Sequence, residues 1–215
     1  MGIYSSVVLP RLINLAMQTA AMDRERARWI PLAIGRVIEV GFGSGLSLRH
    51  YSADVARLDA VDPSRELWNL ATRRCAQSRV QVTFTPGSAE ALSFEDGVFD
   101  TAVVMWTLCS IPDPTRALHE IRRVLRPDGR LIFVEHGRAP EASTRRWQSR
   151  ITPIWKRIAG GCELGRDIAG LLTDAGFEFG TLETGYSEGP RPFAFLYKGV
   201  AKQHARRGEV DGPAF

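Results

Sequence analysis

The stretch that decides the fold is Glu39-Val40-Gly41-Phe42-Gly43-Ser44-Gly45, in which glycine occupies every second position from residue 41 to residue 45. Residues 36–40, which run into it, are short, apolar and rich in β-branched side chains, as is typical of a central buried strand. A glycine-rich loop between a strand and a following helix lets backbone amides approach a ligand closely. We therefore predict a ligand-binding loop at residues 41–45.

The spacing of these glycines argues against two common nucleotide sites. A dinucleotide fingerprint needs a further glycine at position 46, where this chain has Leu46, so hydride transfer to a nicotinamide is disfavoured. A phosphate-binding loop ends in Lys-Ser or Lys-Thr, and no such pair follows Gly45.

A carboxylate follows the next predicted strand, which spans residues 57–61. Asp62 stands 17 positions after Gly45, where a carboxylate can accept two hydrogen bonds from a ribose diol. Its structural alternative is to cap the helix expected over residues 65–77. Together the loop and Asp62 indicate a nucleoside site without a phosphate binder, which suits a ligand that contains adenosine but no phosphate.

Outward from this loop, strands and helices alternate, and this indicates an α/β fold with a parallel sheet. Without a helix between them, the last two strands should run antiparallel. Pro153 is expected to interrupt the Arg- and Trp-rich stretch 143–158. The predicted strands cover residues 36–40, 57–61, 80–85, 99–105, 131–134, 177–184 and 193–200. One predicted helix begins at Leu46, and three further helices cover residues 65–77, 114–126 and 166–175.

The chain divides into three predicted parts: a helical lid or cap segment at residues 1–35, the α/β domain at 36–200 and a flexible tail at 201–215. Residues 5–22 are too apolar to lie in water alone. They form a helix that closes the core, a lid over a site, or an anchor on a membrane surface.

Composition places the chain among ordinary soluble proteins, with 44% hydrophobic and 24% charged residues. The net charge of +4 comes from scattered arginines, so no nucleic-acid partner is predicted. Its three cysteines are widely spaced without a CxxC, and the histidines show no metal spacing, so neither disulfides nor a metal are expected. No signal peptide or membrane span is predicted, and a cytoplasmic location follows.

Five segments resemble, in order and spacing, the motifs of class I S-adenosylmethionine-dependent methyltransferases: residues 39–45, 61–63, 87–90, 99–100 and 125–131. The resemblance covers about residues 30–200. It implies a Rossmann-like, seven-stranded, mostly parallel sheet with helices on both faces and an antiparallel last strand. It also implies S-adenosylmethionine as methyl donor, S-adenosylhomocysteine as product and no metal.

In that family the glycine loop passes beneath the methionine part of the cofactor. The acidic residue after the second strand holds the ribose, and the segment after the third strand meets the adenine. Many relatives have aspartate where Ser88 stands, which weakens the expected adenine contact of that side chain. The resemblance thus assigns cofactor binding to Glu39, Gly41, Gly43, Gly45, Asp62, Pro63, Ser88, Ala89, Glu90 and Trp106.

Further segments are similar to type 11 methyltransferases near the small thiol methyltransferases, a group that includes the microsomal enzymes of animals. These segments are residues 107–110, 134–136 and 160–166 together with Trp147 and Trp155. The resemblance implies a small-molecule acceptor, most readily a thiol or another apolar nucleophile. Two alternatives stay open: a phospholipid or quinone acceptor at a membrane surface, reached through residues 1–22, and a cofactor-binding protein without turnover. A monomer or a homodimer is expected.

Ligands of an open parallel sheet lie beyond the carboxyl ends of its strands, so residues 106–111, 135–139 and the N-terminal segment should wall the acceptor. His136 is the candidate general base, and its alternative role is to order the loop around it. Cys109 could instead be a small buried hydrophobe, and Arg166 could bind an anionic acceptor or cap a carbonyl. The candidate acceptor-binding residues are Cys109, His136, Trp147, Cys162 and Arg166.

Overall fold

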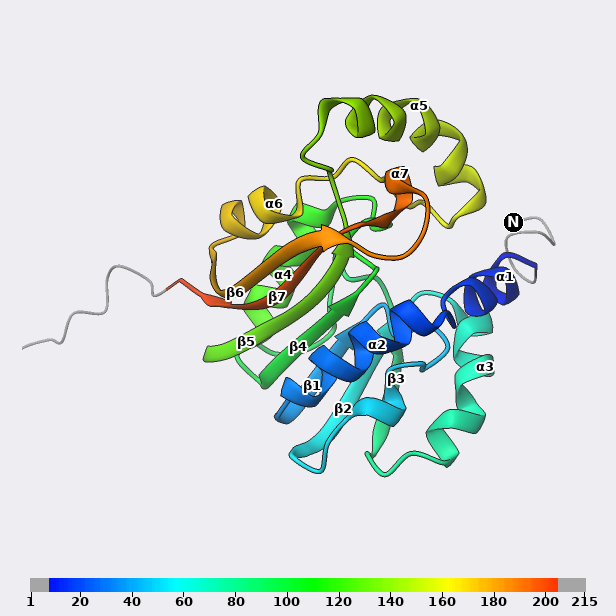
Figure 1. Cartoon of the computed structure of the whole chain (residues 1–215). Helices are drawn as coiled ribbons and strands as arrows, with labels where there is room; N and C mark the ends of the chain where they lie inside the picture. Colours follow the sequence, from blue (N-terminus) through cyan, green and yellow to red (C-terminus); the bar gives the residue numbers. More distant parts are fainter. Residues whose placement is uncertain (1–7, 205–215) are drawn as a thin grey trace, which may run out of the picture.

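A single seven-stranded sheet forms the centre of the protein in the computed structural model, which describes residues 8–204 (Figure 1). Its strand order is β3-β2-β1-β4-β5-β7-β6. Neighbours from β3 to β5 pair in parallel, whereas β7 pairs antiparallel with both β5 and β6. The predicted α/β sheet with an antiparallel end is confirmed. The strands are β1 (Gly35–Val40), β2 (Val55–Asp62), β3 (Val82–Pro86), β4 (Phe99–Met105), β5 (Leu125–His136), β6 (Phe177–Tyr186) and β7 (Phe195–Gln203).

Two of the helices that follow parallel strands begin at side-chain caps. Ser64 accepts a hydrogen bond from the Leu67 N–H, and Asp113 accepts one from the Arg116 N–H. Each cap satisfies an N–H that the first helical turn leaves unpaired. The α-helices are α1 (Leu9–Ala16), α2 (Ala20–Trp29), α3 (Arg65–Ala76), α4 (Pro114–Val124), α5 (Ala142–Ile158), α6 (Ile168–Asp174) and α7 (Arg191–Ala194), and two short 3-10 turns are η2 (Ile30–Leu32) and η3 (Leu48–His50).

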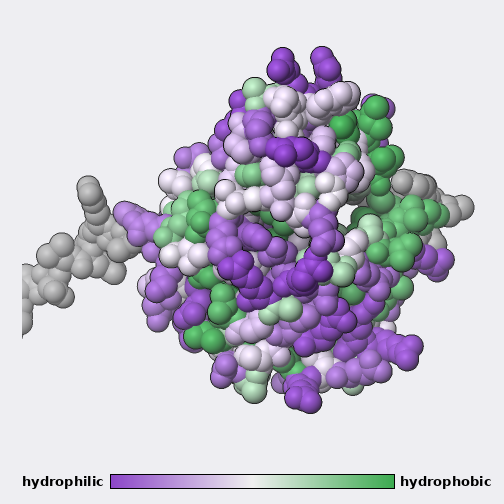
Figure 2. Space-filling model, in the orientation of Figure 1, coloured by the Kyte–Doolittle hydropathy of each residue, from purple (hydrophilic) through white to green (hydrophobic). Residues whose placement is uncertain are grey.

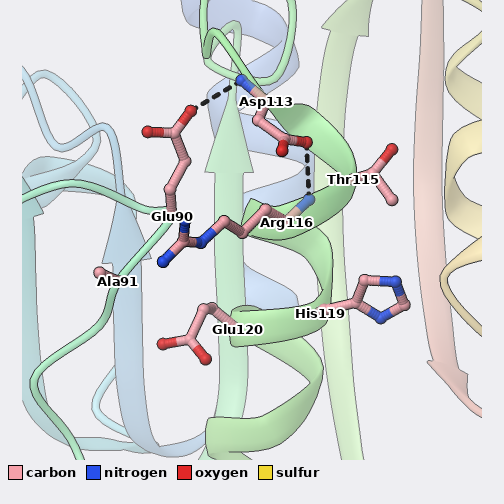
Figure 3. A pocket seen from close by; sticks show the side chains of 7 residues that line it. All are labelled: Glu90, Ala91, Asp113, Thr115, Arg116, His119 and Glu120. Atoms are coloured by element: carbon pink, nitrogen blue, oxygen red, sulfur yellow. Dashed lines mark hydrogen bonds between the residues drawn. The ribbon is translucent and has the colours of Figure 1, made fainter.

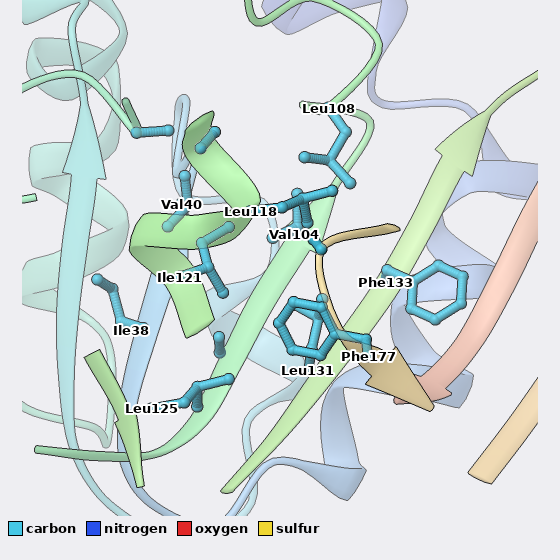
Figure 4. Close-up of a cluster of buried hydrophobic side chains, with 14 of the residues drawn as sticks. Ile38, Val40, Val104, Leu108, Leu118, Ile121, Leu125, Leu131, Phe133 and Phe177 are labelled. Atoms are coloured by element: carbon cyan, nitrogen blue, oxygen red, sulfur yellow. The ribbon is translucent and has the colours of Figure 1, made fainter. Parts of the chain in front are cut away.

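Alternating side chains of the central strands supply two separate cores. Ile38 and Val104 pack on one face with apolar residues of α4 and α6 (Figure 4). The adjacent residues Val37 and Val103 point to the other face and pack with Trp29 of α2 and with α3. Successive side chains of a strand face opposite ways, so an almost continuous apolar run is what a sheet covered on both faces requires.

The expected helix at residues 46–51 is wrong, because the structure has only the 3-10 turn η3 there. The chain turns inward at Tyr51, whose hydroxyl donates a 2.9 Å hydrogen bond to Glu39. His50 contacts Asp23 of α2 at 2.8 Å. These contacts draw the segment onto α2 and β1, and β2 begins at Val55.

Three predicted boundaries also differ. Helix α5 continues through Pro153, since Ile151 before it and Trp155 after it both pack on the same small cluster. Helix α4 ends at Val124 and the chain enters β5 directly, where the sequence predicts helix to residue 126. Strand β7 runs to Gln203, into the segment expected as tail, and the rest of that tail lies almost entirely outside the described residues. Within residues 8–204, no helix has the length and apolar character needed to cross a bilayer.

Candidate functional site

A cavity of about 550 Å³ lies at the carboxyl ends of β1, β2, β4 and β5. This volume is in the range of small-molecule sites. One end of the cavity is formed by the glycine-rich loop and Asp62, and the other by the chain after β4, His136 and residues 155–162. Helix α1 lines it as well, and Figure 1 shows α1 and α5 at this end of the sheet.

Of the three alternate glycines in the loop, only Gly43 has open space where a side chain would stand. Gly41, Gly43 and Gly45 have φ of 77°, 58° and 73°, values that L-residues rarely adopt. A Cβ on Gly41 would overlap the Thr107 side chain, whereas one on Gly43 would meet only the Gly41 carbonyl oxygen, at 3.9 Å. The loop is therefore packed against the protein at Gly41 and open towards the cavity at Gly43.

Asp62 fixes this loop from the end of β2. Its Oδ2 accepts a 2.8 Å hydrogen bond from the Gly43 N–H, and its Oδ1 accepts one of 2.8 Å from the Ser64 N–H. Burial raises the pKa of Asp62 while these two N–H groups lower it. Ser64, not Asp62, caps α3, so the structural alternative for Asp62 does not hold.

Glu39 is the second buried carboxylate at this end of the cavity. The Tyr51 hydroxyl donates to it, yet burial raises the pKa of Glu39 to about 7. Arg26, also buried, stacks over Trp106 with its Cζ 5.0 Å from the ring centroid. Trp106 has a φ of 51°, a conformation that is costly for a non-glycine residue and is concentrated at functional sites.

The predicted adenine segment divides between two surfaces. Pro63, Ser88 and Ala89 line the cavity. Glu90 points away from it, accepts a 2.7 Å hydrogen bond from the Asp113 N–H at the start of α4, and lines a separate polar depression of about 440 Å³ (Figure 3). The structure thus supports a role for Glu90 in positioning α4.

At the other end of the cavity the structure brings together Cys109, His136 and Cys162, whose ligating atoms all lie within 4.8 Å of one another. A hydrogen bond to Cys109, together with His136, lowers the pKa of the Cys162 thiol, whereas the hydrogen bond to Cys162 and then burial raise the pKa of Cys109. Sequence reasoning identified each residue as a candidate acceptor contact but did not bring the three together.

The two remaining acceptor candidates lie outside the cavity lining. Trp147 is exposed on α5, under the guanidinium of Arg150. Arg166 donates hydrogen bonds to the Leu108 carbonyl oxygen and to Glu163. Of the two roles considered for it, the structure therefore supports capping of a carbonyl and not binding of an anionic acceptor.

Glu135 lies in the segment 135–139 that the sequence predicts as a wall of the acceptor, but the role of its side chain was not predicted. Its carboxylate accepts backbone hydrogen bonds from Thr107 at 2.7 Å, Leu108 at 3.0 Å and Cys109 at 3.2 Å. It is fully buried and holds the loop that carries Cys109. In the sequence, the one feature that could have indicated this role is the position of Glu135, an acidic residue directly after the apolar residues 131–134.

Comparison with known proteins agrees with this geometry. A family model described as a methyltransferase domain matches residues 38–133, which include the loop, Asp62 and β4. Human thiol S-methyltransferase TMT1B is 34% identical over 152 residues, which are 67% of this chain and 62% of the human protein. Residues 38–133 form a methyltransferase domain of the class I S-adenosylmethionine-dependent type.

Two further relatives of this chain extend the comparison. A phosphatidylethanolamine N-methyltransferase from Cereibacter sphaeroides is 36% identical over 104 residues, covering 47% of this chain and 51% of the relative. The structure of an S-adenosylmethionine-dependent methyltransferase from Methanosarcina mazei superposes with a TM-score of 0.65 and 25% identity, covering 80% of this chain and 93% of that one. The chain therefore spans between half and two thirds of the first two relatives' length.

The side chains that line the cavity fit S-adenosylmethionine. Two buried carboxylates, Glu39 and Asp62, line the cavity. Among the described residues that line it, Arg26 is the only arginine, and there is no lysine. That balance suits a ligand with a ribose diol and cationic sulfonium and ammonium groups, and it disfavours a phosphate. Asp62 would hold the ribose, Glu39 would face the cationic methionine part, and the open space at Gly43 would admit the ligand against the loop.

The affinity of the protein for S-adenosylhomocysteine should depend on pH through Glu39, whose charged neighbours are Arg26 and Asp62. Because the pKa of Glu39 in the free protein is about 7, binding a cation beside its ionised form requires loss of a proton below that pH. We expect a dissociation constant about tenfold higher at pH 6 than at pH 8. Calorimetric titration across this range measures it.

The matched control for this titration is Glu39→Gln, which keeps an oxygen to accept from Tyr51 but cannot ionise. Its affinity should be low and should vary less with pH than that of the wild type. A wild-type affinity that is flat from pH 6 to pH 8 would contradict the role of Glu39.

Proposed function

We propose that the protein transfers the methyl group of S-adenosylmethionine to the sulfur of a small thiol. The observation that carries the proposal is one continuous cavity with two chemically different ends. Its carboxylate end suits a cationic donor, and its other end is lined by sulfur, imidazole and apolar groups from Cys109, Cys162, His136, Trp155 and Ile158. The similarity to a human thiol S-methyltransferase supports this acceptor class.

Methyl transfer from a sulfonium is an in-line displacement, so the protein's main contributions are alignment and exclusion of water. The new bond joins the acceptor sulfur to the methyl carbon, and the electron pair of the broken bond returns to the donor sulfur. A thiol has an ordinary pKa of about 8.5 and is ionised by a modest change of environment. The acceptor end therefore needs a group that favours the thiolate, and His136 as general base is the role predicted from the sequence.

We infer that α1 closes the cavity as a lid. Leu9, Ile13 and Met17 of this segment line the cavity together with the loop. The helix also exposes apolar side chains to solvent: Leu12, at the border of the cavity, is 51% accessible and Leu15 is 70% accessible. Figure 2 shows this apolar surface continuing onto the adjacent end of α5, where Ile154 and Ile158 are exposed.

That exposed apolar rim favours one second candidate, a phospholipid acceptor reached at a membrane surface. The similarity to a phosphatidylethanolamine N-methyltransferase supports the same candidate. It differs from the favoured function in the atom that receives the methyl group, which would be nitrogen.

The test is a panel of acceptors with isotope-labelled methyl donor: small alkyl and aryl thiols, a phenol, an amine and phosphatidylethanolamine vesicles. We expect label in the thioether product of the thiols, with one S-adenosylhomocysteine formed per methyl transferred. Label in the vesicles alone would support the phospholipid candidate. Donor binding without label in any product would support a binding protein without turnover.

Removal of residues 1–22 forms a second arm of this test. Loss of methyl transfer to a soluble thiol supports the lid, because water would then enter the acceptor end. Loss of vesicle binding alone, with thiol methylation intact, would contradict the lid and support an anchor.

A further inference from the structure

Cys109, His136 and Cys162 are more than a lining of the acceptor end. They reach the cavity from three separate segments: the loop after β4, the end of β5 and the loop after α5. Their two sulfur atoms and one imidazole nitrogen all lie within 4.8 Å of one another. Cys109 is 1% and Cys162 is 7% exposed. Both thiols are therefore buried, and the cluster is not a chance proximity of surface side chains.

Backbone contacts hold the two cysteine segments together. The Glu163 N–H donates a 2.8 Å hydrogen bond to the Cys109 carbonyl oxygen. Gly161, with φ of 95°, passes so close that a Cβ there would lie 2.9 Å from the Ser110 carbonyl oxygen. Glu135, the neighbour of His136, binds the Cys109 N–H at 3.2 Å. Backbone contacts of the fold therefore bring the three side chains together.

Two thiols and one imidazole form a ligand set that thiophilic divalent cations prefer. In tetrahedral zinc sites the Zn–S and Zn–N distances of about 2.3 and 2.0–2.1 Å place neighbouring ligand atoms roughly 3.5–3.8 Å apart. Side-chain rotations that shorten the present separations by about 1 Å would reach that geometry. Trp155 Nε1 is buried without a hydrogen-bond partner, and its ring packs on the cluster that contains Cys109 and Cys162. A metal-bound thiolate in this cluster would give that N–H an acceptor.

We propose that Cys109, His136 and Cys162 bind a thiophilic divalent cation such as Zn²⁺ and leave one coordination position open to the cavity for the sulfur of the acceptor thiol. Three protein ligands with one open position are typical of catalytic zinc sites. The cation site is inferred only from the geometry of the three side chains. Binding of the acceptor thiol at the open position rests in addition on the proposed function. This replaces the sequence-based expectation of no metal.

The cation would promote loss of the proton from the acceptor thiol, which is the role that a general base would otherwise have. A thiol that coordinates it releases its proton to solvent and stays bound as a thiolate. The thiolate sulfur then bonds to the methyl carbon while the carbon–sulfonium bond breaks. The neutral thioether product is a weaker ligand than the thiolate and leaves, and His136, as a ligand, carries no proton in this step.

The cation site is tested on the full chain, purified under reducing conditions, freed of metal and titrated with Co²⁺. We expect one equivalent to bind, with tetrahedral d–d absorption in the visible and thiolate-to-cobalt charge transfer in the near ultraviolet. Cys162→Ser should lose both signals, and Cys75→Ser, whose thiol lies outside the cluster, should keep them. Circular dichroism checks that both variants are folded.

Two results would overturn the cation site. One is cobalt binding that is no stronger in the wild type than in Cys162→Ser. The other is a Cys109–Cys162 disulfide that persists in the reduced preparation and excludes the ion, which would make the pair a redox element instead.

The open position has its own test, in the absence of methyl donor. Addition of 2-mercaptoethanol to the cobalt form should increase and shift the charge-transfer band, since a third sulfur joins the ion. An unchanged spectrum would overturn the acceptor role while leaving the cation site. A spectral change without methyl transfer in the acceptor panel would instead place the failure in the proposed function.

Discussion

Replacing Asp62 with alanine is expected to weaken binding of S-adenosylmethionine and S-adenosylhomocysteine by about 100-fold, close to 3 kcal/mol. The carboxylate would supply both hydrogen bonds to the ribose. It also accepts the N–H groups of Gly43 and Ser64, so the substitution loosens the loop against which the cofactor lies. Calorimetric titration of both ligands measures the loss.

The matched control is Asp54→Ala, an exposed aspartate just before the opposite end of β2. Its affinity for both ligands should equal that of the wild type. Equal affinities in Asp62→Ala and wild type would contradict the ribose role, and failure of the wild type to bind either ligand would remove the cofactor assignment itself.

Glu135→Ala is expected to lower the free energy of unfolding by about 3 kcal/mol. Three backbone N–H groups, those of Thr107, Leu108 and Cys109, would lose their acceptor in a buried place, and each unsatisfied group costs about 1–3 kcal/mol before relaxation. Urea denaturation followed by circular dichroism measures the change. The loop that carries Cys109 should lose its position, so thiol methylation should fall further than cofactor binding.

Glu135→Gln is the informative companion variant. It keeps one side-chain oxygen as acceptor, so we expect a smaller loss of stability than for alanine. A value for Glu135→Ala within about 0.5 kcal/mol of the wild type, the range of ordinary surface substitutions, would show that the carboxylate does not hold the loop.

That the glycine-rich loop and Asp62 lie together at the cavity could be predicted from the sequence, because these features are local. Residues 39–45 combine a strand, a turn and a close approach in one segment, and Asp62 closes the strand that pairs with it. Both features are recognisable by spacing alone. The alternation of elements likewise predicted the sheet, since each βα unit contains its own signal.

The acceptor end could not be predicted in the same way. Cys109 and His136 are 27 positions apart and His136 and Cys162 are 26 apart, so no motif links them. Their proximity depends on the pairing of β4 with β5 and on a loop contact at Gly161, which are properties of tertiary structure. Pro153 shows the same limit, because packing on both sides of it outweighs the local preference to end the helix.

The reversed direction of β7 has a practical consequence for handling the protein. The strand starts beside the site, where Leu196 pairs with His136, and it ends at the opposite edge of the sheet, where Lys202 pairs with Arg130. At about 3.3 Å per residue, its nine residues carry the chain roughly 30 Å from the cavity. A fluorophore or surface tether placed just after Gln203 would therefore report on or immobilise the molecule without blocking the entry of either ligand.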